Sequence, residues 1–377
     1  MAFPTVRRGS AAVLGLLLMV GGTALTAPAA AAPPQKTAVI VQLAAGSDAS
    51  VEARLAAGTD GRVSHVFRSV FRGFSAELSD RAIAALRRNP HVALIEPDGV
   101  VTTAETAASW GLDRIDQRAL PLNGTYNVPA AGAAVTAYIL DTGVAPTADL
   151  DQRATGYDGI TPGGDGSGDC NGHGTHVAGT VAGTAYGVAK TATVVPVRVL
   201  DCTGSGTWSG IIAGLDWVVG NHVSGPAVAN LSLGGGASST VDAAVQRVIA
   251  DGVTVTVAAG NSNADACNTS PARASAALTV GATDNADRRA SFSNYGSCLD
   301  LFAPGVAITS DWLTGTNTIS GTSMATPHVA GAAAVLLSNN PTMSPAIVAS
   351  TLVGTATTGV VKSAGTRSPN RLLYSAG

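Results

Sequence analysis

An aspartate, a histidine and a serine lie at three points of the chain where their side chains could together carry out nucleophilic catalysis. Asp141 follows the apolar run VTAYIL, His173 lies among glycines in NGHGTHVAGTVAG, and Ser323 lies in SGTSMATPHVAG, where an apolar helical pattern begins. A serine hydroxyl becomes an effective nucleophile when a neutral imidazole takes its proton. That imidazole needs a carboxylate to fix its tautomer and to stabilise its charged form. We therefore expect Asp141 to orient His173, and His173 to act as the general base for Ser323.

A side-chain amide could complete this chemistry. Asn261 lies in VTVAAGNSN, directly after another apolar run. Its amide, together with the backbone N–H of Ser323 at the start of a helix, could donate hydrogen bonds to a developing oxyanion. The sequence therefore predicts an oxyanion hole formed by Asn261 and Ser323.

The segments around these residues alternate between two kinds of apolar pattern. Short Val/Ile/Leu/Ala runs predict strands at 135–140, 194–200, 228–233, 253–258 and 278–280, and longer amphipathic stretches predict helices at 175–185, 208–219, 241–251 and 322–338. Near-continuous apolar strands separated by helices are typical of a doubly wound α/β fold, a mostly parallel sheet with helices on both faces. In such folds, residues that follow the strands lie together beyond the carboxyl edge of the sheet.

A smaller unit precedes this sheet. Residues 36–100 have the pattern β-α-β-β-α-β, which predicts a small ferredoxin-like α+β domain. The segment TTAETAAS at 102–109 has small side chains and no apolar periodicity, so we expect an exposed linker that a protease can enter. The predicted domains are therefore 1–32, 33–103 and 104–377.

The first 32 residues have the three parts of a secretory signal peptide. Arg7 and Arg8 precede an apolar run at 11–20, and a small-residue stretch follows at 24–32. The run is about half the roughly 20 residues that span a bilayer, so we expect export and no membrane anchor. The sequence leaves the export route, general or twin-arginine, open.

Composition excludes several classes of partner. The 377 residues carry a net charge of −3 without runs of like charge, which argues against a dedicated nucleic-acid binder. Nothing in the pattern suggests an assembly larger than a monomer.

Four cysteines lie in the second half of the chain, at positions 170, 202, 267 and 298. In an exported protein this even number favours two disulfides, with three possible pairings. The alternative is a zinc site made by Cys170, His173, His176 and Cys202. Because H-E-x-x-H is absent and export favours disulfides, we expect disulfides.

Long strings around every candidate residue resemble the blocks of the subtilisin-like serine peptidases: YILDTGV, NGHGTHVAGTVAG, VVPVRVLD, NLSLGG, TVAAGN and SGTSMATPHVAG. The resemblance covers about 105–377, and 36–100 resembles the inhibitory propeptide of the same family. WGLDRIDQRALPLNGTY at 110–126 and RRASFSNYG at 288–296 are similar to the proteinase K-like branch, in particular its bacterial aqualysin-type members. The resemblance implies a secreted endopeptidase of broad specificity that forms an acyl-enzyme and processes itself from a pre-pro-enzyme.

The resemblance also implies partners and site residues. The propeptide would act as an intramolecular chaperone and inhibitor, protein and peptide chains would be the substrates, and the chemistry would need no cofactor. The sequential disulfides would be Cys170–Cys202 and Cys267–Cys298. The substrate backbone would pair with two segments, one formed by Gly204, Ser205 and Gly206 and the other by Ser232, Leu233, Gly234 and Gly235. The P1 side chain would enter a pocket lined by Ala258, Ala259 and Gly260.

Structural calcium is a further implication. One site would use Asp300 with the backbone carbonyls of Ser275 and Ala277. A second would use Asp113, Asp116 and Gln117. Near the second site the chain has Asn123 where a carboxylate is often found, which lowers the charge available to a cation.

Two other classes of function compete with a peptidase. A non-catalytic relative could keep the fold and bind peptides, but such proteins usually lose one of the catalytic residues. A serine esterase would carry G-x-S-x-G and place its serine first in the chain, and neither holds here.

Overall fold

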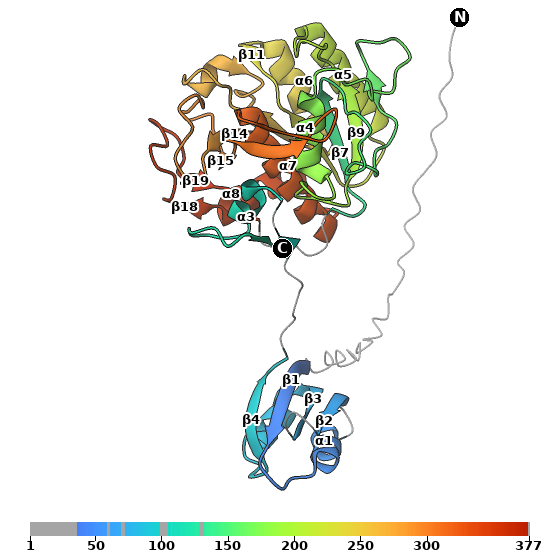
Figure 1. Ribbon diagram of the computed structural model, residues 1–377, viewed down its shortest axis with the longest axis vertical. Helices are drawn as coiled ribbons and strands as arrows, with labels where there is room; N and C mark the ends of the chain where they lie inside the picture. Colours follow the sequence, from blue (N-terminus) through green and yellow to red (C-terminus); the bar gives the residue numbers. More distant parts are fainter. Residues whose placement is uncertain are drawn as a thin grey trace, which may run out of the picture. The chain divides into compact units, whose positions relative to one another are not determined.

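The computed structural model describes residues 36–58, 61–68, 72–98, 105–106, 108–127 and 132–375. It divides into two compact units, Met1–Val101 and Thr102–Gly377 (Figure 1), which are described separately. The predicted signal peptide and the predicted boundary at 103/104 lie outside the described residues. Within those residues, no helix has the length and apolar character needed to cross a membrane.

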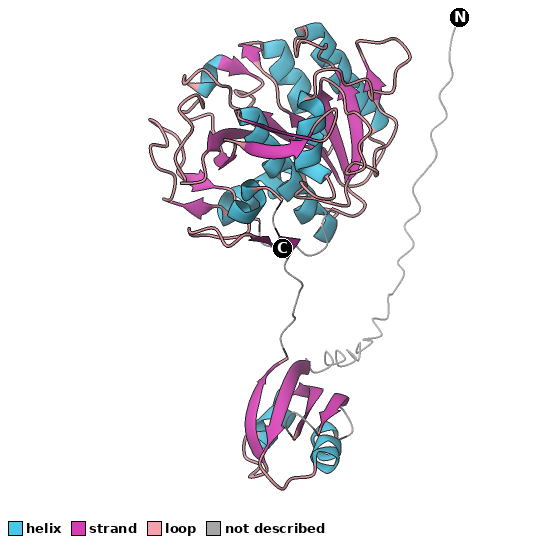
Figure 2. Ribbon diagram, in the orientation of Figure 1, coloured by secondary structure: helices cyan, strands magenta, loops and turns pink. Residues whose placement is uncertain are grey.

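The first unit is an antiparallel sheet with two helices. Its elements are β1 (Lys36–Leu43), α1 (Ala49–Ala57), β2 (Arg62–Phe67), β3 (Gly73–Ser79), α2 (Asp80–Leu86) and β4 (Val92–Pro97). The strand order is β2-β3-β1-β4, and both helices cover one face (Figure 2). Alternate residues of β1 and β3, such as Val41 and Phe74, are fully buried beneath the helices. This is the predicted β-α-β-β-α-β arrangement.

A nine-stranded sheet forms the centre of the second unit. The strand order is β18-β19-β15-β14-β12-β10-β7-β9-β8. The bounds are β7 (Thr136–Asp141), β8 (Tyr157–Asp158), β9 (Thr193–Arg198), β10 (Ala227–Leu231), β12 (Thr254–Ala258), β14 (Leu278–Thr283), β15 (Leu301–Pro304), β18 (Thr357–Thr358) and β19 (Arg371–Leu372). Every pair of neighbouring strands is parallel except the pair β18 and β19, which is antiparallel. All five predicted strands are present.

Helices cover both faces of this sheet, as the sequence predicts. One core cluster joins the sheet to α4 (His173–Ala182), α7 (Thr322–Asn339) and α8 (Pro345–Thr355). A second joins it to α5 (Trp208–Asn221) and α6 (Ser239–Ala250). Because both faces are buried, the strands are rich in apolar residues without a regular polar alternation.

Shorter elements complete the second unit. They are α3 (Trp110–Ile115), η1 (Ala266–Asn268), the pair β5 (Glu105–Thr106) and β6 (Thr125–Tyr126), the pair β11 (Gly235–Gly236) and β13 (Thr269–Ser270), and the hairpin β16 (Ile308–Asp311) and β17 (Thr316–Ile319). The hairpin packs against α4. It therefore lies beside the helix that begins with His173.

Candidate active site

The end of a strand and the start of a helix bring Asp141 and His173 together. Asp141 is the last residue of β7, and His173 is the first residue of α4. His173 Nδ1 lies 2.7 Å from Asp141 Oδ1, which also accepts a hydrogen bond of 2.8 Å from the Thr142 N–H. The Asp141 side chain is fully buried, whereas that of His173 is 25% exposed. The imidazole is thus anchored on one side and open on the other.

The charges around His173 favour its protonated form. Burial lowers the pKa of the imidazole, but the charge and hydrogen bond of Asp141 and the charge of Asp169 outweigh it, so the pKa lies above its ordinary value. The second carboxylate oxygen of Asp141, Oδ2, is buried and has no hydrogen-bond partner among the described residues. The negative charge is therefore poorly solvated, which strengthens its attraction for a nearby imidazolium.

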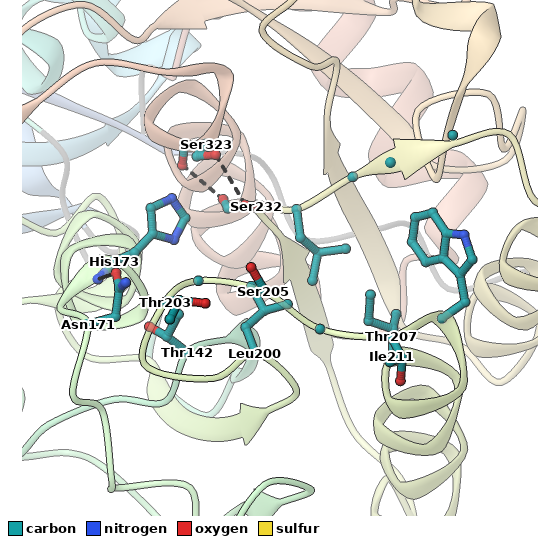
Figure 3. A pocket seen from close by; sticks show the side chains of 17 residues that line it. Thr142, Asn171, His173, Leu200, Thr203, Ser205, Thr207, Ile211, Ser232 and Ser323 are labelled. Carbon is teal, nitrogen blue, oxygen red and sulfur yellow. Dashed lines mark hydrogen bonds between the residues drawn. The ribbon is translucent and has the colours of Figure 1, made fainter.

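Ser323 lies in the first turn of α7, beside a segment that follows β10. Its hydroxyl donates a hydrogen bond of 3.1 Å to the Ser232 carbonyl, and the Ser232 hydroxyl donates one of 2.8 Å to the Ser323 carbonyl (Figure 3). The hydroxyl therefore points to Ser232 rather than to His173 in this structure. Both Ser323 and His173 line the same pocket, so rotation of the serine side chain is the movement needed to bring its proton to the imidazole.

That pocket has a volume of about 810 Å³. Both predicted substrate-binding segments, Gly204–Gly206 and Ser232–Gly235, line it. A Cβ at Gly206 would lie 2.5 Å from the Val199 carbonyl, so this close approach of two backbones requires glycine. Apolar lining residues that the sequence analysis did not single out are Leu200, Trp208 and Ile211.

A second pocket of about 340 Å³ also reaches Ser323. Ala258, Gly260 and Asn261 line it, but Ala259 does not, because its side chain is fully buried in a core cluster with Phe302. Successive side chains of an extended segment point to opposite sides. The expected role of Ala259 in lining this pocket is thus not supported by its position.

Asn261 has a defined orientation at this pocket. Its Oδ1 accepts hydrogen bonds from the Thr322 N–H, at 2.8 Å, and from the Thr322 hydroxyl, at 2.9 Å. Because the oxygen is held by two donors, the amide nitrogen is the group left to donate. The sequence analysis did not identify Thr322, although it directly precedes Ser323.

The cysteines form the sequential disulfides Cys170–Cys202 and Cys267–Cys298. The alternative of a zinc site is wrong, because both of its sulfur ligands are taken up in the first disulfide. His176 is fully buried with Nε2 at 3.0 Å from the Ile308 carbonyl, and burial lowers its pKa to about 4. It is a neutral interior histidine.

Among the residues expected at the first calcium site, Asp300 directly precedes β15, and Ser275 and Ala277 lie in the turn before β14. Asp300 Oδ2 accepts a hydrogen bond of 2.8 Å from the Thr279 N–H. Burial raises the pKa of Asp300 to about 6, against the opposing effects of that hydrogen bond and of Arg371. A buried carboxylate whose charged form is poorly solvated fits a site that a cation would stabilise.

The second expected calcium site contains an unpaired oxygen. Asp116 Oδ1 is buried without a hydrogen-bond partner in the described part of the chain, and burial, together with the charge of Asp113, raises the pKa of Asp116. Asp113 accepts backbone hydrogen bonds from Asn123 and Gly124, at 3.2 and 2.8 Å. The Gln117 amide nitrogen donates to the carbonyls of Ala119 and Pro121. The orphaned oxygen fits a calcium ligand.

Comparison with known proteins identifies both units. Residues 132–372 match the model of the subtilase family, and residues 30–104 match that of peptidase inhibitor I9. The chain is 59% identical over 320 residues to an extracellular serine proteinase of Thermus sp. (strain Rt41A), covering 83% of this chain and 78% of the relative. It is 52% identical over 326 residues to alkaline serine exoprotease A of Vibrio alginolyticus, covering 83% of this chain and 60% of that relative.

A solved structure is similar over the whole of its own length. The crystal structure of a cold adapted subtilisin-like serine proteinase is 54% identical, with a TM-score of 0.70, and covers 72% of this chain and 100% of that chain.

Proposed function

The chain belongs to the subtilase family, and on that premise we propose that it is a serine endopeptidase in which Ser323 is the nucleophile, His173 the general base and Asp141 the orienting carboxylate. The observation that carries this assignment is the 2.7 Å contact between His173 Nδ1 and Asp141 Oδ1 on the pocket that Ser323 lines. No other arrangement of the described residues around this pocket combines a nucleophile, a base and a buried carboxylate.

The reaction follows from these positions. The Ser323 hydroxyl turns from the Ser232 carbonyl to His173 Nε2, gives up its proton there and attacks the substrate carbonyl. His173 then protonates the leaving amine, which leaves an acyl group on Ser323. Water, deprotonated by the same imidazole, hydrolyses this acyl-enzyme. Asp141 keeps the ring proton on Nδ1 and stabilises the imidazolium during both steps.

The negative charge that develops on the carbonyl oxygen meets two donors. The Ser323 N–H belongs to the first turn of α7, where backbone N–H groups have no acceptor within the helix. The Asn261 amide nitrogen is the second donor, since Thr322 holds the amide oxygen. Together they form the oxyanion hole.

Substrate is held as an extended strand. Gly204–Gly206 and Ser232–Gly235 offer backbone groups on two sides of the larger pocket, and the Ser232 carbonyl becomes available once the Ser323 hydroxyl has left it. The smaller pocket, lined by Ala258 and Gly260, receives the P1 side chain. Its small lining residues fit broad specificity with apolar or aromatic P1 groups.

The precursor has three parts in this proposal: a signal peptide at 1–32, an inhibitory propeptide at 33–103 and the peptidase at 104–377. The match of 30–104 to an inhibitor family and the extracellular relatives support export and inhibition by the propeptide. The propeptide also assists folding, because a parallel sheet with long-range contacts forms slowly. Cleavage by the enzyme itself near 103–109 releases a monomeric mature enzyme.

Two sets of residues would hold structural calcium in this proposal. Asp300 with the carbonyls of Ser275 and Ala277 would hold one ion, and Asp113, Asp116 and Gln117 would hold the other. Bound there, calcium would neutralise carboxylates that burial leaves poorly solvated.

Labelling of the nucleophile tests the assignment. The secreted enzyme is treated with a serine-directed phosphonylating reagent, the modified residue is mapped by mass spectrometry, and casein hydrolysis is followed in the same samples. Modification of Ser323 alone, with loss of activity in proportion, is expected. Ser323→Ala should remain an unprocessed precursor, whereas Ser320→Ala, an exposed serine three positions away, should mature and cleave casein. Maturation of Ser323→Ala without any added protease would contradict self-processing, and casein cleavage by an unlabelled enzyme would contradict the nucleophile.

A further inference from the structure

Asp169 is a carboxylate that the proposed mechanism does not use. Its Oδ1 accepts hydrogen bonds from the Thr142 hydroxyl at 3.0 Å and from the N–H groups of Asn171 and Gly172 at 2.9 Å each. Its Oδ2 accepts from the Thr175 N–H at 3.0 Å and from the Thr175 hydroxyl at 2.6 Å. Both oxygens are therefore fully engaged with donors from the surrounding backbone and side chains.

These donors belong to the segments that carry the two residues of the Asp141–His173 pair. Thr142 directly follows Asp141 at the end of β7, and Thr175 lies in the first turn of α4, two residues after His173. The Thr142 hydroxyl, while donating to Asp169, also accepts a hydrogen bond of 2.9 Å from the Gly174 N–H. One carboxylate thus joins the end of the strand that carries Asp141 to the start of the helix that carries His173.

The charge of Asp169 acts on the same imidazole. It adds to the effect of Asp141 in raising the pKa of His173. Other titratable groups on the elements that pack against α4 do not oppose it: His176 on α4 and His328 on α7 are buried and have lowered pKa values, and Arg198 on β9 is paired with Asp158. Asp311 on β16 lies by Gly179, two turns away from His173.

We infer that Asp169 is a positioning residue for peptide hydrolysis, which holds Asp141 and His173 in register and supplies a second negative charge that favours the protonated imidazole. The inference rests on the proposed function, in which His173 is the general base. Removal of the charge should make His173 a weaker base that loses its proton at lower pH, and removal of the hydrogen bonds should misalign the pair.

The pH profile of Asp169→Asn separates this role from simple support of the fold. The full chain is produced by secretion, correctly folded sites are counted by phosphonylation of Ser323, and kcat and KM are measured per site on a short peptide amide. We expect the acid limb of the kcat/KM profile to move to lower pH. We also expect kcat on the plateau to fall about tenfold, with KM changed less than about threefold, because loss of alignment acts on the chemical step.

The matched control is Asp165→Asn, in the same loop. Asp165 is exposed and accepts a hydrogen bond of 2.9 Å from the Ser167 N–H, so this variant should keep the parent's acid limb and kcat. If the acid limb of the kcat/KM profile of Asp169→Asn coincides with that of the parent and of Asp165→Asn, the inference is overturned. Failure of the parent to label at Ser323 would instead overturn the proposed function.

Thr142→Val keeps the inference testable if Asp169→Asn does not mature. Valine has the shape of threonine but breaks the link from Asp169 to Gly174 while leaving the carboxylate charge in place. We expect kcat to fall several-fold with the acid limb unmoved. A Thr142→Val enzyme with the parent's kcat would contradict the positioning role.

Discussion

The carboxyl groups of Asp149 and Asp311 both lie against Gly183, at the end of α4. The Oδ2 atom of each is buried, and the described residues offer it no donor. A Cβ at Gly183 would lie 2.3 Å from Asp149 Oδ2 and 3.1 Å from Asp311 Oδ2, so the glycine makes room for the pair. Burial first, and then the hydrogen bond and charge of Asp149, raise the pKa of Asp311 to about 8. The Asp311 carboxyl therefore favours its protonated form at neutral pH.

Asp311→Asn should make the fold less sensitive to alkali. A carboxyl with a raised pKa in the folded chain contributes stability that is fully present below its unfolded pKa, about 4, and is lost as the pH rises through about 8. Asparagine can donate to Asp149 at every pH. The variant should therefore gain stability relative to the parent from about pH 4 to about pH 8, and the difference should then stay constant.

Thermal unfolding as a function of pH measures this difference, with Ser323→Ala in both proteins to prevent autolysis. Asp151→Asn removes an exposed carboxylate and is the control; it should follow the parent. A constant difference between Asp311→Asn and the parent at all pH values would show that the pair holds no proton.

Asp141→Asn should lower kcat by about 10⁴ with little change in KM. An amide at this position can donate to His173 Nδ1, which leaves the ring proton on Nε2 and removes the base that Ser323 needs; a loss of this size is seen for the same change in an unrelated triad protease. Single-turnover rates on a peptide amide, normalised to correctly folded protein, provide the measurement. A fall as small as that expected for Asp169→Asn would mean that the two carboxylates have comparable roles.

Most of the sheet could be predicted from the sequence because parallel strands buried on both faces are rich in apolar residues. Each predicted strand and helix of the second unit is present within a few residues. The prediction missed α8, although Ser344 accepts a hydrogen bond from the Ile347 N–H and Pro345 occupies the first turn, both of which are helix-start signals. It also missed β16 and β17, whose residues ITSD and TNTI carry no apolar alternation.

The candidate site was predictable in its residue types but not in its supporting contacts. Long motifs mark Asp141, His173 and Ser323. In contrast, the rotamer that turns the Ser323 hydroxyl to Ser232 depends on local packing, which no motif records. Asp169 had a usable signal, since an aspartate that accepts from the N–H groups two and three residues on forms an Asx turn. Its bonds to Thr142 and Thr175 become visible only in three dimensions.

Calcium removal should destabilise the mature enzyme. With Ser323 of the mature enzyme phosphonylated to prevent autolysis, a chelator should lower the midpoint of thermal unfolding, and Asp300→Asn and Asp116→Asn should each remove part of that response. Because the pKa of Asp300 is about 6, protons compete with calcium there, and the contribution of this site should weaken as the pH falls through about 6. Asp151→Asn should keep the full response. Variants at both sites that respond to the chelator like the parent would rule out these ligands.

Asn261→Ala should lower kcat about 10²–10³-fold, the loss seen when the oxyanion-hole asparagine of subtilisin is removed, with KM nearly unchanged. The ground-state carbonyl makes little use of this donor, whereas the oxyanion depends on it. Thr322→Val leaves the Thr322 N–H in place and removes only the hydroxyl that donates to Asn261 Oδ1 at 2.9 Å. The asparagine should then be less well oriented, and kcat should fall by a smaller factor. The same hydroxyl also accepts a hydrogen bond of 3.2 Å from the Gly260 N–H. If its effect on the reaction passes through the Asn261 amide, combining the two changes should cost no more than Asn261→Ala alone. Additive losses in the double variant would show that Thr322 serves the reaction by another route.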